Sequence, residues 1–105
     1  MNTLTPTMPR WVIDAGHAWL VVELADYPHA LNFGTGYGYM DDSRIYLEED
    51  VEAVAFLEMH PEILSRHLDS CHYDGDAPCR RLKANEAILD AERFWAARRA
   101  HYANA

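Results

Sequence analysis

Short runs of apolar and β-branched residues in the first half of the chain predict strands. Trp11-Val12-Ile13 and residues 18 to 24 form two such runs, and Asp14-Ala15-Gly16 between them is a turn sequence, so a hairpin is predicted. In a strand, alternate side chains share a face. The second run therefore predicts one core face, made by Ala18, Leu20, Val22 and Leu24.

A second hairpin is predicted before residue 50. Residues 34 to 38 have glycine at alternate positions, which is typical of a loop entering a tightly approached strand. The runs Tyr37–Met40 and Arg44–Leu47 then flank the polar turn Asp41-Asp42-Ser43.

The hydrophobic period changes to that of helices after this hairpin. Residues 50 to 59 fit one helix, with Asp50 as the expected N-cap and Glu52 in the first turn. Pro61 interrupts it and can open a second helix that runs through His67. Residues 69 to 79 are rich in turn formers and predict a loop, whereas residues 81 to 102 predict a long amphipathic helix.

The element order predicts an α+β fold. We expect a small antiparallel sheet of three to five strands, from about residue 11 to 47, covered on one face by helices from the C-terminal half. A chain of 105 residues fits one domain, so residues 1 to 9 are expected to be a flexible lead-in to a single domain of residues 10 to 105.

The charge is divided along the chain and restricts the partners. Residues 1 to 79 hold fourteen acidic and three basic residues, a charge of −11, whereas residues 80 to 105 carry +3. Such an acidic body excludes direct nucleic-acid binding and anionic membranes and favours a basic protein surface. The N-terminus has no signal-peptide pattern and there are two cysteines, so we expect a cytoplasmic protein of a bacterial host with reduced thiols.

The expected partner-binding residues are acids and tyrosines around the predicted second hairpin. Three consecutive acids stand where a strand is expected to become a helix, and further acids before and after them would extend an acidic edge for Arg or Lys of a partner. The alternative is that Asp50 caps the helix and its two neighbours are only solvated. Tyr37 and Tyr39, at alternate positions, share a strand face. With three further aromatic residues of the predicted sheet they form either an exposed recognition patch or a second buried layer; these three are Tyr46, Trp19 and His17. The full set of expected partner-binding residues is Asp41, Asp42, Glu48, Glu49, Asp50, Glu52, Tyr37 and Tyr39.

Metal and catalytic chemistry have weaker signals. One cluster has metal-ligand residue types but no common zinc spacing, and its cysteines could instead form a disulfide or stay free; its members are His67, Cys71, His72 and Cys79. Asp14 with His17, and Cys71 with His72, are pairs of acid–base or nucleophile type without a third orienting group. No catalytic residue and no cofactor is therefore predicted.

Three segments together resemble a group of small uncharacterised proteins of bacteria, phages and plasmids. The segments are residues 16 to 22 (Gly-His-Ala-Trp-Leu-Val-Val), 36 to 39 (Gly-Tyr-Gly-Tyr) and 46 to 50 (Tyr-Leu-Glu-Glu-Asp). The group's last motif continues Cys-Asp-Ala, where this chain has Val51 and Glu52 before Ala53. The resemblance covers about residues 12 to 57 and implies a mobile-element origin.

Size and acidity are also similar to those of anti-CRISPR proteins, some of which mimic DNA with carboxylates. By this analogy we expect an inhibitor of a host nucleic-acid-binding defence complex, such as a CRISPR effector complex. The alternatives are a small zinc-stabilised domain and a self-associating accessory protein. A homodimer would use one face of the C-terminal helix, formed by Ile88, Trp95 and Tyr102.

Overall fold

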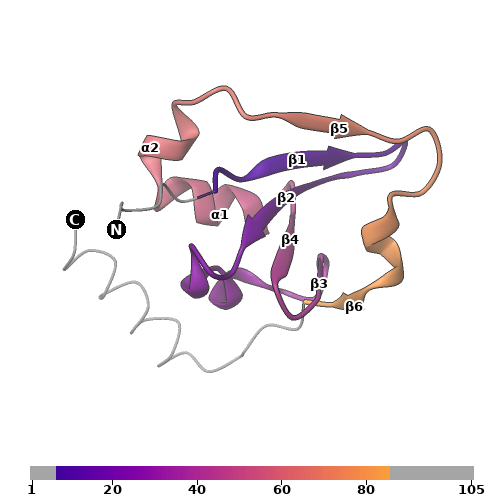
Figure 1. The fold of residues 1–105 in the computed structure, drawn as a ribbon, viewed down its shortest axis with the longest axis horizontal. Coiled ribbons are helices and arrows are strands. Elements are labelled where there is room, and N and C mark those ends of the chain that lie inside the picture. The colour runs from indigo at the N-terminus through magenta and orange to yellow at the C-terminus, as the bar shows by residue number, and fades with distance from the viewer. Residues whose placement is uncertain (1–6, 86–105) are drawn as a thin grey trace, which may run out of the picture.

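The computed structural model describes residues 7 to 85 (Figure 1). Six strands, two short α-helices and two 3₁₀ helices follow one another in this part of the chain. In chain order they are β1 (Arg10–Ile13), β2 (Ala18–Glu23), η1 (Pro28–Phe33), β3 (Tyr39–Met40), β4 (Arg44–Glu48), α1 (Glu52–Glu58), α2 (Pro61–Leu64), β5 (Ser70–His72), η2 (Pro78–Arg81) and β6 (Lys83–Ala84).

The strands form one mixed sheet in the order β5-β1-β2-β4-β3-β6. The predicted α+β class is confirmed, but the prediction of an antiparallel sheet limited to residues 11 to 47 is wrong. After α2 the chain returns along β1 and adds β5 parallel to it, with Trp11 paired to Ser70 and Ile13 to His72. The sequence did not signal β5 because its three side chains are polar or small and all are exposed, so it joins the sheet through its backbone.

Both predicted hairpins are confirmed. β1 pairs antiparallel with β2, and β3 pairs antiparallel with β4. An aspartate fixes each turn with its own carboxylate: Asp14 accepts the amides of Gly16 and His17, and Asp41 accepts those of Ser43 and Arg44. This arrangement is the reason that aspartate is favoured at the start of tight turns.

One face of the sheet carries the larger core. Leu20 and Val22 of β2 pack there with Ile45 of β4 and Phe56 of α1, and all four are fully buried. The covering layer is made by α1, α2 and η1, and η1 precedes β3 in the chain. Helices from the C-terminal half were expected to cover one face, and this holds only in part. α1 and α2 lie there, but η1 from the N-terminal half shares the layer, and β5 and β6 extend the sheet.

The opposite face of the sheet is also covered. The segment around η2 packs Ala77 and Cys79 on Trp19 and Val21 of β2, which are buried although they lie opposite the core face predicted from alternation. Alternation identifies a core face only where the other face is solvated. Here both faces of β2 are buried.

The helix boundaries differ from the predicted ones. The residue before α1 is Val51 and it makes no side-chain cap, so the prediction of Asp50 as N-cap is wrong. The carboxylate of Glu48 instead accepts the amides of Asp50 and Val51, at 2.9 and 3.0 Å. The start of α2 at Pro61 is confirmed, but this helix ends at Leu64 rather than near residue 67.

The last described residues correct the predicted start of the long helix. Residues 78 to 81 form η2 and residues 83 and 84 form β6, which pairs with β3, so no α-helix begins at Arg81. The rest of that predicted helix, with its dimer face, lies outside the described residues, as do residues 1 to 6 of the predicted lead-in. From Thr7 the lead-in is described: the amide of Thr7 donates to Asp26, and Pro9 is fully buried. Within residues 7 to 85, no helix has the length and apolar character needed to cross a membrane.

Candidate functional site

A buried hydrogen-bonded cluster fixes the glycine loop that precedes β3. The side-chain oxygen of Asn85 accepts the amides of Gly36 and Gly38, each at 3.1 Å, and its nitrogen donates to Glu52 at 2.7 Å. Glu52 is 1% exposed, and its second carboxylate oxygen accepts the amide and the hydroxyl of Thr35. Since Tyr37 stands between the two glycines held by Asn85, this cluster sets where Tyr37 leaves the backbone.

A second buried carboxylate anchors η2 to the first hairpin. Asp14 accepts two hydrogen bonds from the guanidinium of Arg80, at 2.7 and 3.1 Å, and one from the amide of Ala77 at 2.9 Å. The hydrogen bonds from Arg80 hold the pKa of Asp14 well below its ordinary value, against the opposing effect of burial, and the same contact raises the pKa of Arg80. This pair fixes the position of Arg80.

Trp19 lies next to this ion pair on the second face of the sheet. The guanidinium carbon of Arg80 is 4.9 Å from the centre of the Trp19 ring, a cation–π distance. Tyr39 packs at 5.9 Å on the same ring, and the ring of His17 is 6.1 Å away. Trp19 is also paired directly with Glu48 across β2 and β4, so these two side chains leave the same face of the sheet as neighbours.

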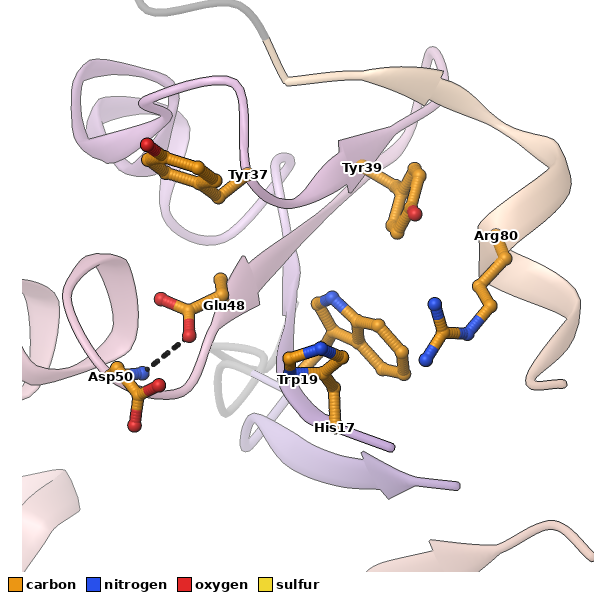
Figure 2. Close-up of a pocket in the computed structure, with 7 residues that line it drawn as sticks. All are labelled: His17, Trp19, Tyr37, Tyr39, Glu48, Asp50 and Arg80. Atoms are coloured by element: carbon orange, nitrogen blue, oxygen red, sulfur yellow. Dashed lines mark hydrogen bonds between the residues drawn. The ribbon is translucent and has the colours of Figure 1, made fainter. Parts of the chain in front are cut away.

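These side chains line a pocket of about 360 Å³ on that face (Figure 2). Tyr37 and Tyr39 border one side, Glu48 and Asp50 lie near the end of β4, and Trp19 with His17 and Arg80 complete the lining. The lining comes from the first hairpin, the glycine loop with β3, the end of β4 and η2. It is therefore made only when the sheet and η2 are assembled.

The pocket has an uneven charge. The positive charge of Arg80 is already paired with Asp14, whereas Glu48 and Asp50 bring two carboxylates to the opposite end of the pocket. Tyr37 is 75% exposed beside them, the most exposed of the large hydrophobic side chains among the described residues. Carboxylates next to exposed aromatic rings suit a cationic group.

The structure brings some of the predicted binding residues together and separates the others from them. Tyr37, Tyr39, Glu48 and Asp50 come together in the pocket, and the half-buried Glu49 uses one oxygen to accept the amide of Ala18 at 3.3 Å. Tyr37 and Tyr39 were expected to belong either to a recognition patch or to a buried layer. Tyr37 is exposed, whereas Tyr39 is half-buried against the core.

Three predicted acids lie elsewhere. Asp41 and Asp42 stand at the other end of β4, about 13 Å away along this five-residue strand. Glu52 is buried and fully used inside the domain, so its predicted role as a surface contact is wrong. An acid in the first turn of a helix is usually solvated, so the sequence predicted an exposed Glu52. Its contact with Asn85, 33 residues later in the chain, is visible only in the structure.

The four predicted metal-ligand candidates do not come together. Among residues 7 to 85, no group of three or more His, Cys, Asp and Glu is arranged to hold a metal ion. Both cysteines are free, Cys71 exposed on β5 and Cys79 buried within η2, and burial raises the pKa of Cys79 to about 11. The alternative of a zinc site therefore has no support among residues 7 to 85. β5 carries Cys71 to the sheet edge, whereas Cys79, in η2, is buried against β2.

The two pairs considered for catalysis have no catalytic geometry. The carboxylate of Asp14 accepts the backbone amide of His17 and is held by Arg80. Cys71 and His72 are successive residues of β5, so their side chains point to opposite faces. Neither pair has the aligned nucleophile and base that a hydrolase or transferase needs.

Comparison of the chain with protein-family models, with curated proteins and with solved structures found no match in any of the three. The resemblance to phage and plasmid proteins therefore stays a prediction. The described fold and pocket define the chain only as a small α+β protein with a mixed sheet.

The Asp14–Arg80 pair gives a pH-dependent prediction. The pKa of Asp14 is lowered in the folded protein, whereas an aspartate in the unfolded chain has a pKa of about 4. The contribution of Asp14 to stability is therefore complete above about pH 4. It is lost progressively as the pH falls from there toward the lowered pKa of the folded protein. Asp14→Asn should lower the urea midpoint at pH 7, and the difference from the unaltered protein should shrink between pH 4 and pH 2. Urea unfolding at several pH values measures this. Asp74→Asn, at an exposed loop position, is the control, and a difference for Asp14→Asn that is the same at pH 2 and pH 7 would contradict the assignment.

Proposed function

We propose that this protein is a non-enzymatic binding module that engages a basic protein surface through the pocket and its acidic end. The observation that carries the proposal is the placement of Glu48 and Asp50 beside the exposed ring of Tyr37, on a sheet face whose own cation is internally paired. A basic side chain from a partner would lose its hydration water there and contact two carboxylates and an aromatic face instead.

The specific form of this proposal is that the protein inhibits a nucleic-acid-binding defence complex of its host. Such complexes expose Arg and Lys to hold phosphates, and those side chains are suitable partners for an acidic pocket. The arrangement of the acids supports one anchored basic side chain better than an extended imitation of DNA. Asp41 and Asp42 are separated from Glu48 and Asp50 by the length of β4, and Glu52 is inside the core.

The test is a pull-down from host lysate with tagged protein at low and high salt, followed by mass spectrometry. We expect a partner whose capture weakens in high salt, because screening reduces contacts between exposed charges. Asp50→Lys should reduce this capture about tenfold or more, since it places a cation where the partner's cation binds. Asp50 is exposed, so the exchange leaves the core unchanged.

Asp42→Lys is the matched control, because it makes the same charge reversal at an exposed site in the turn between β3 and β4. It should retain the partner. Loss of capture with Asp42→Lys together with retention by Asp50→Lys would move the interface to the opposite end of β4 and refute the pocket.

A further inference from the structure

The indole N–H of Trp19 has no hydrogen-bond partner among residues 7 to 85, although the side chain is 2% exposed. Buried donors are nearly always paired, because leaving one without an acceptor costs the whole loss of hydration. An unpaired buried donor inside a pocket is therefore a sign of a ligand that brings an acceptor.

The position of this nitrogen fits a ligand in the pocket. Figure 2 shows the indole nitrogen on the ring edge away from Arg80, directed toward the space between Tyr39 and Glu48. Its neighbour across the strands is Glu48, so the residue with the donor and the residue with the carboxylate leave the same sheet face at paired positions. The nitrogen is buried before binding, so an entering acceptor has to turn a lining side chain aside.

The two ends of the pocket are therefore suited to two different chemical groups of a ligand. One group is an acceptor oxygen for Trp19, and the other is a cation for Glu48 and Asp50 beside Tyr37. An arginine residue in a peptide carries both, a backbone carbonyl and a guanidinium. Its planar guanidinium also stacks on tyrosine and pairs with carboxylates better than the ammonium of lysine does.

We propose that the pocket binds an arginine residue of a protein partner, with its carbonyl oxygen accepting from Nε1 of Trp19 and its guanidinium at Glu48 and Asp50. This inference rests on the proposed binding function and names the group that is recognised. The N–H of Trp19 is then satisfied only in the complex, which makes it a reporter of binding.

The indole N–H signals of the ¹⁵N-labelled full chain test the inference directly. The chain has three tryptophans, and Trp19→Phe assigns the Trp19 signal by its disappearance. Titration with N-acetyl-arginine methylamide should move this signal downfield to saturation. N-acetyl-citrulline methylamide, nearly the same shape without the charge, should bind at least tenfold more weakly, and n-butylguanidinium should bind without the downfield shift because it has no carbonyl.

Trp19→Phe keeps an aromatic ring but removes the donor, so it should weaken binding of the arginine probe at least fivefold. Trp11→Phe is the control, since Trp11 packs against the core on the opposite face of the sheet, and it should bind as the unaltered protein does. Circular dichroism of both variants verifies the fold. If Trp19→Phe does not fold, Trp11→Phe and Trp95→Phe assign the Trp19 signal by elimination, and the probe titration of the unaltered protein still decides.

A Trp19 signal that stays in place at saturation, or equal binding of the arginine and citrulline probes, would overturn the inference. The proposed function would survive that result if capture from lysate still depended on Asp50. Conversely, probe binding at Trp19 with no Asp50-dependent partner would support the pocket's ligand class and remove the protein-binding role.

Discussion

Replacing Gly38 by alanine is expected to destabilise the protein by about 3 kcal/mol or more. A Cβ atom at this position would collide with the backbone carbonyl oxygen of Tyr46. It would also lie 2.5 Å from the side-chain nitrogen of Asn85 and 2.6 Å from a carboxylate oxygen of Glu52. None of these groups can move freely, because one belongs to β4 and the other two are buried and hydrogen-bonded to each other.

Thermal unfolding followed by circular dichroism measures the effect of Gly38→Ala. For a domain of this size, 3 kcal/mol corresponds to a fall in Tm of roughly 12 °C or more. Gly75→Ala is the matched control, since a Cβ there meets no atom within 4 Å, and its stability should lie within about 0.5 kcal/mol of the unaltered protein. Equal Tm values for the two variants would show that the glycine loop at Gly38 does not approach β4 as closely as described.

Glu52→Gln is the second change with a large expected effect, a loss of about 2 to 4 kcal/mol. The two oxygens of Glu52 accept the amide of Glu48, the amide and hydroxyl of Thr35, and the side-chain nitrogen of Asn85. Glutamine keeps one acceptor oxygen and places an NH₂ group where the other oxygen stood. At least one buried donor therefore meets another donor.

Chemical denaturation with urea measures the loss for Glu52→Gln. Glu58→Gln is the control, because Glu58 is an exposed residue at the end of the same helix and the substitution changes the charge equally. It should shift the urea midpoint little. If Glu52→Gln unfolds at the same urea concentration as Glu58→Gln, a single acceptor oxygen is sufficient for the cluster.

The parts of the fold that could be predicted from sequence are those with local signals. Turn residues between apolar runs located both hairpins, and Pro61 located the start of α2. β5 gave no signal because an exposed edge strand of three small or polar residues has no apolar period. Asn85 stands at a position where neighbouring residues follow a helical period, and its insertion into the glycine loop is a contact across 47 residues.

The candidate site was predictable to the extent that its residues are close in the chain. Tyr37, Tyr39, Glu48 and Asp50 cluster around one hairpin, and their residue types indicated recognition. Trp19 was expected only among the aromatic residues of the sheet, and Arg80 was not expected at the site. They join this group through strand register and through the buried pair with Asp14. The signal that could have found Trp19 was the register itself, since aligning the two hairpins places it opposite Glu48.

The ends of the sheet have a consequence for self-assembly. The described sheet finishes on one side with the three exposed, mostly polar residues of β5 and on the other with the two residues of β6, one of them Lys83. Short or charged edge strands offer few unpaired backbone groups to a neighbouring molecule, which is how many β-proteins avoid growing into fibrils. At high concentration this sheet should therefore resist extension at either edge.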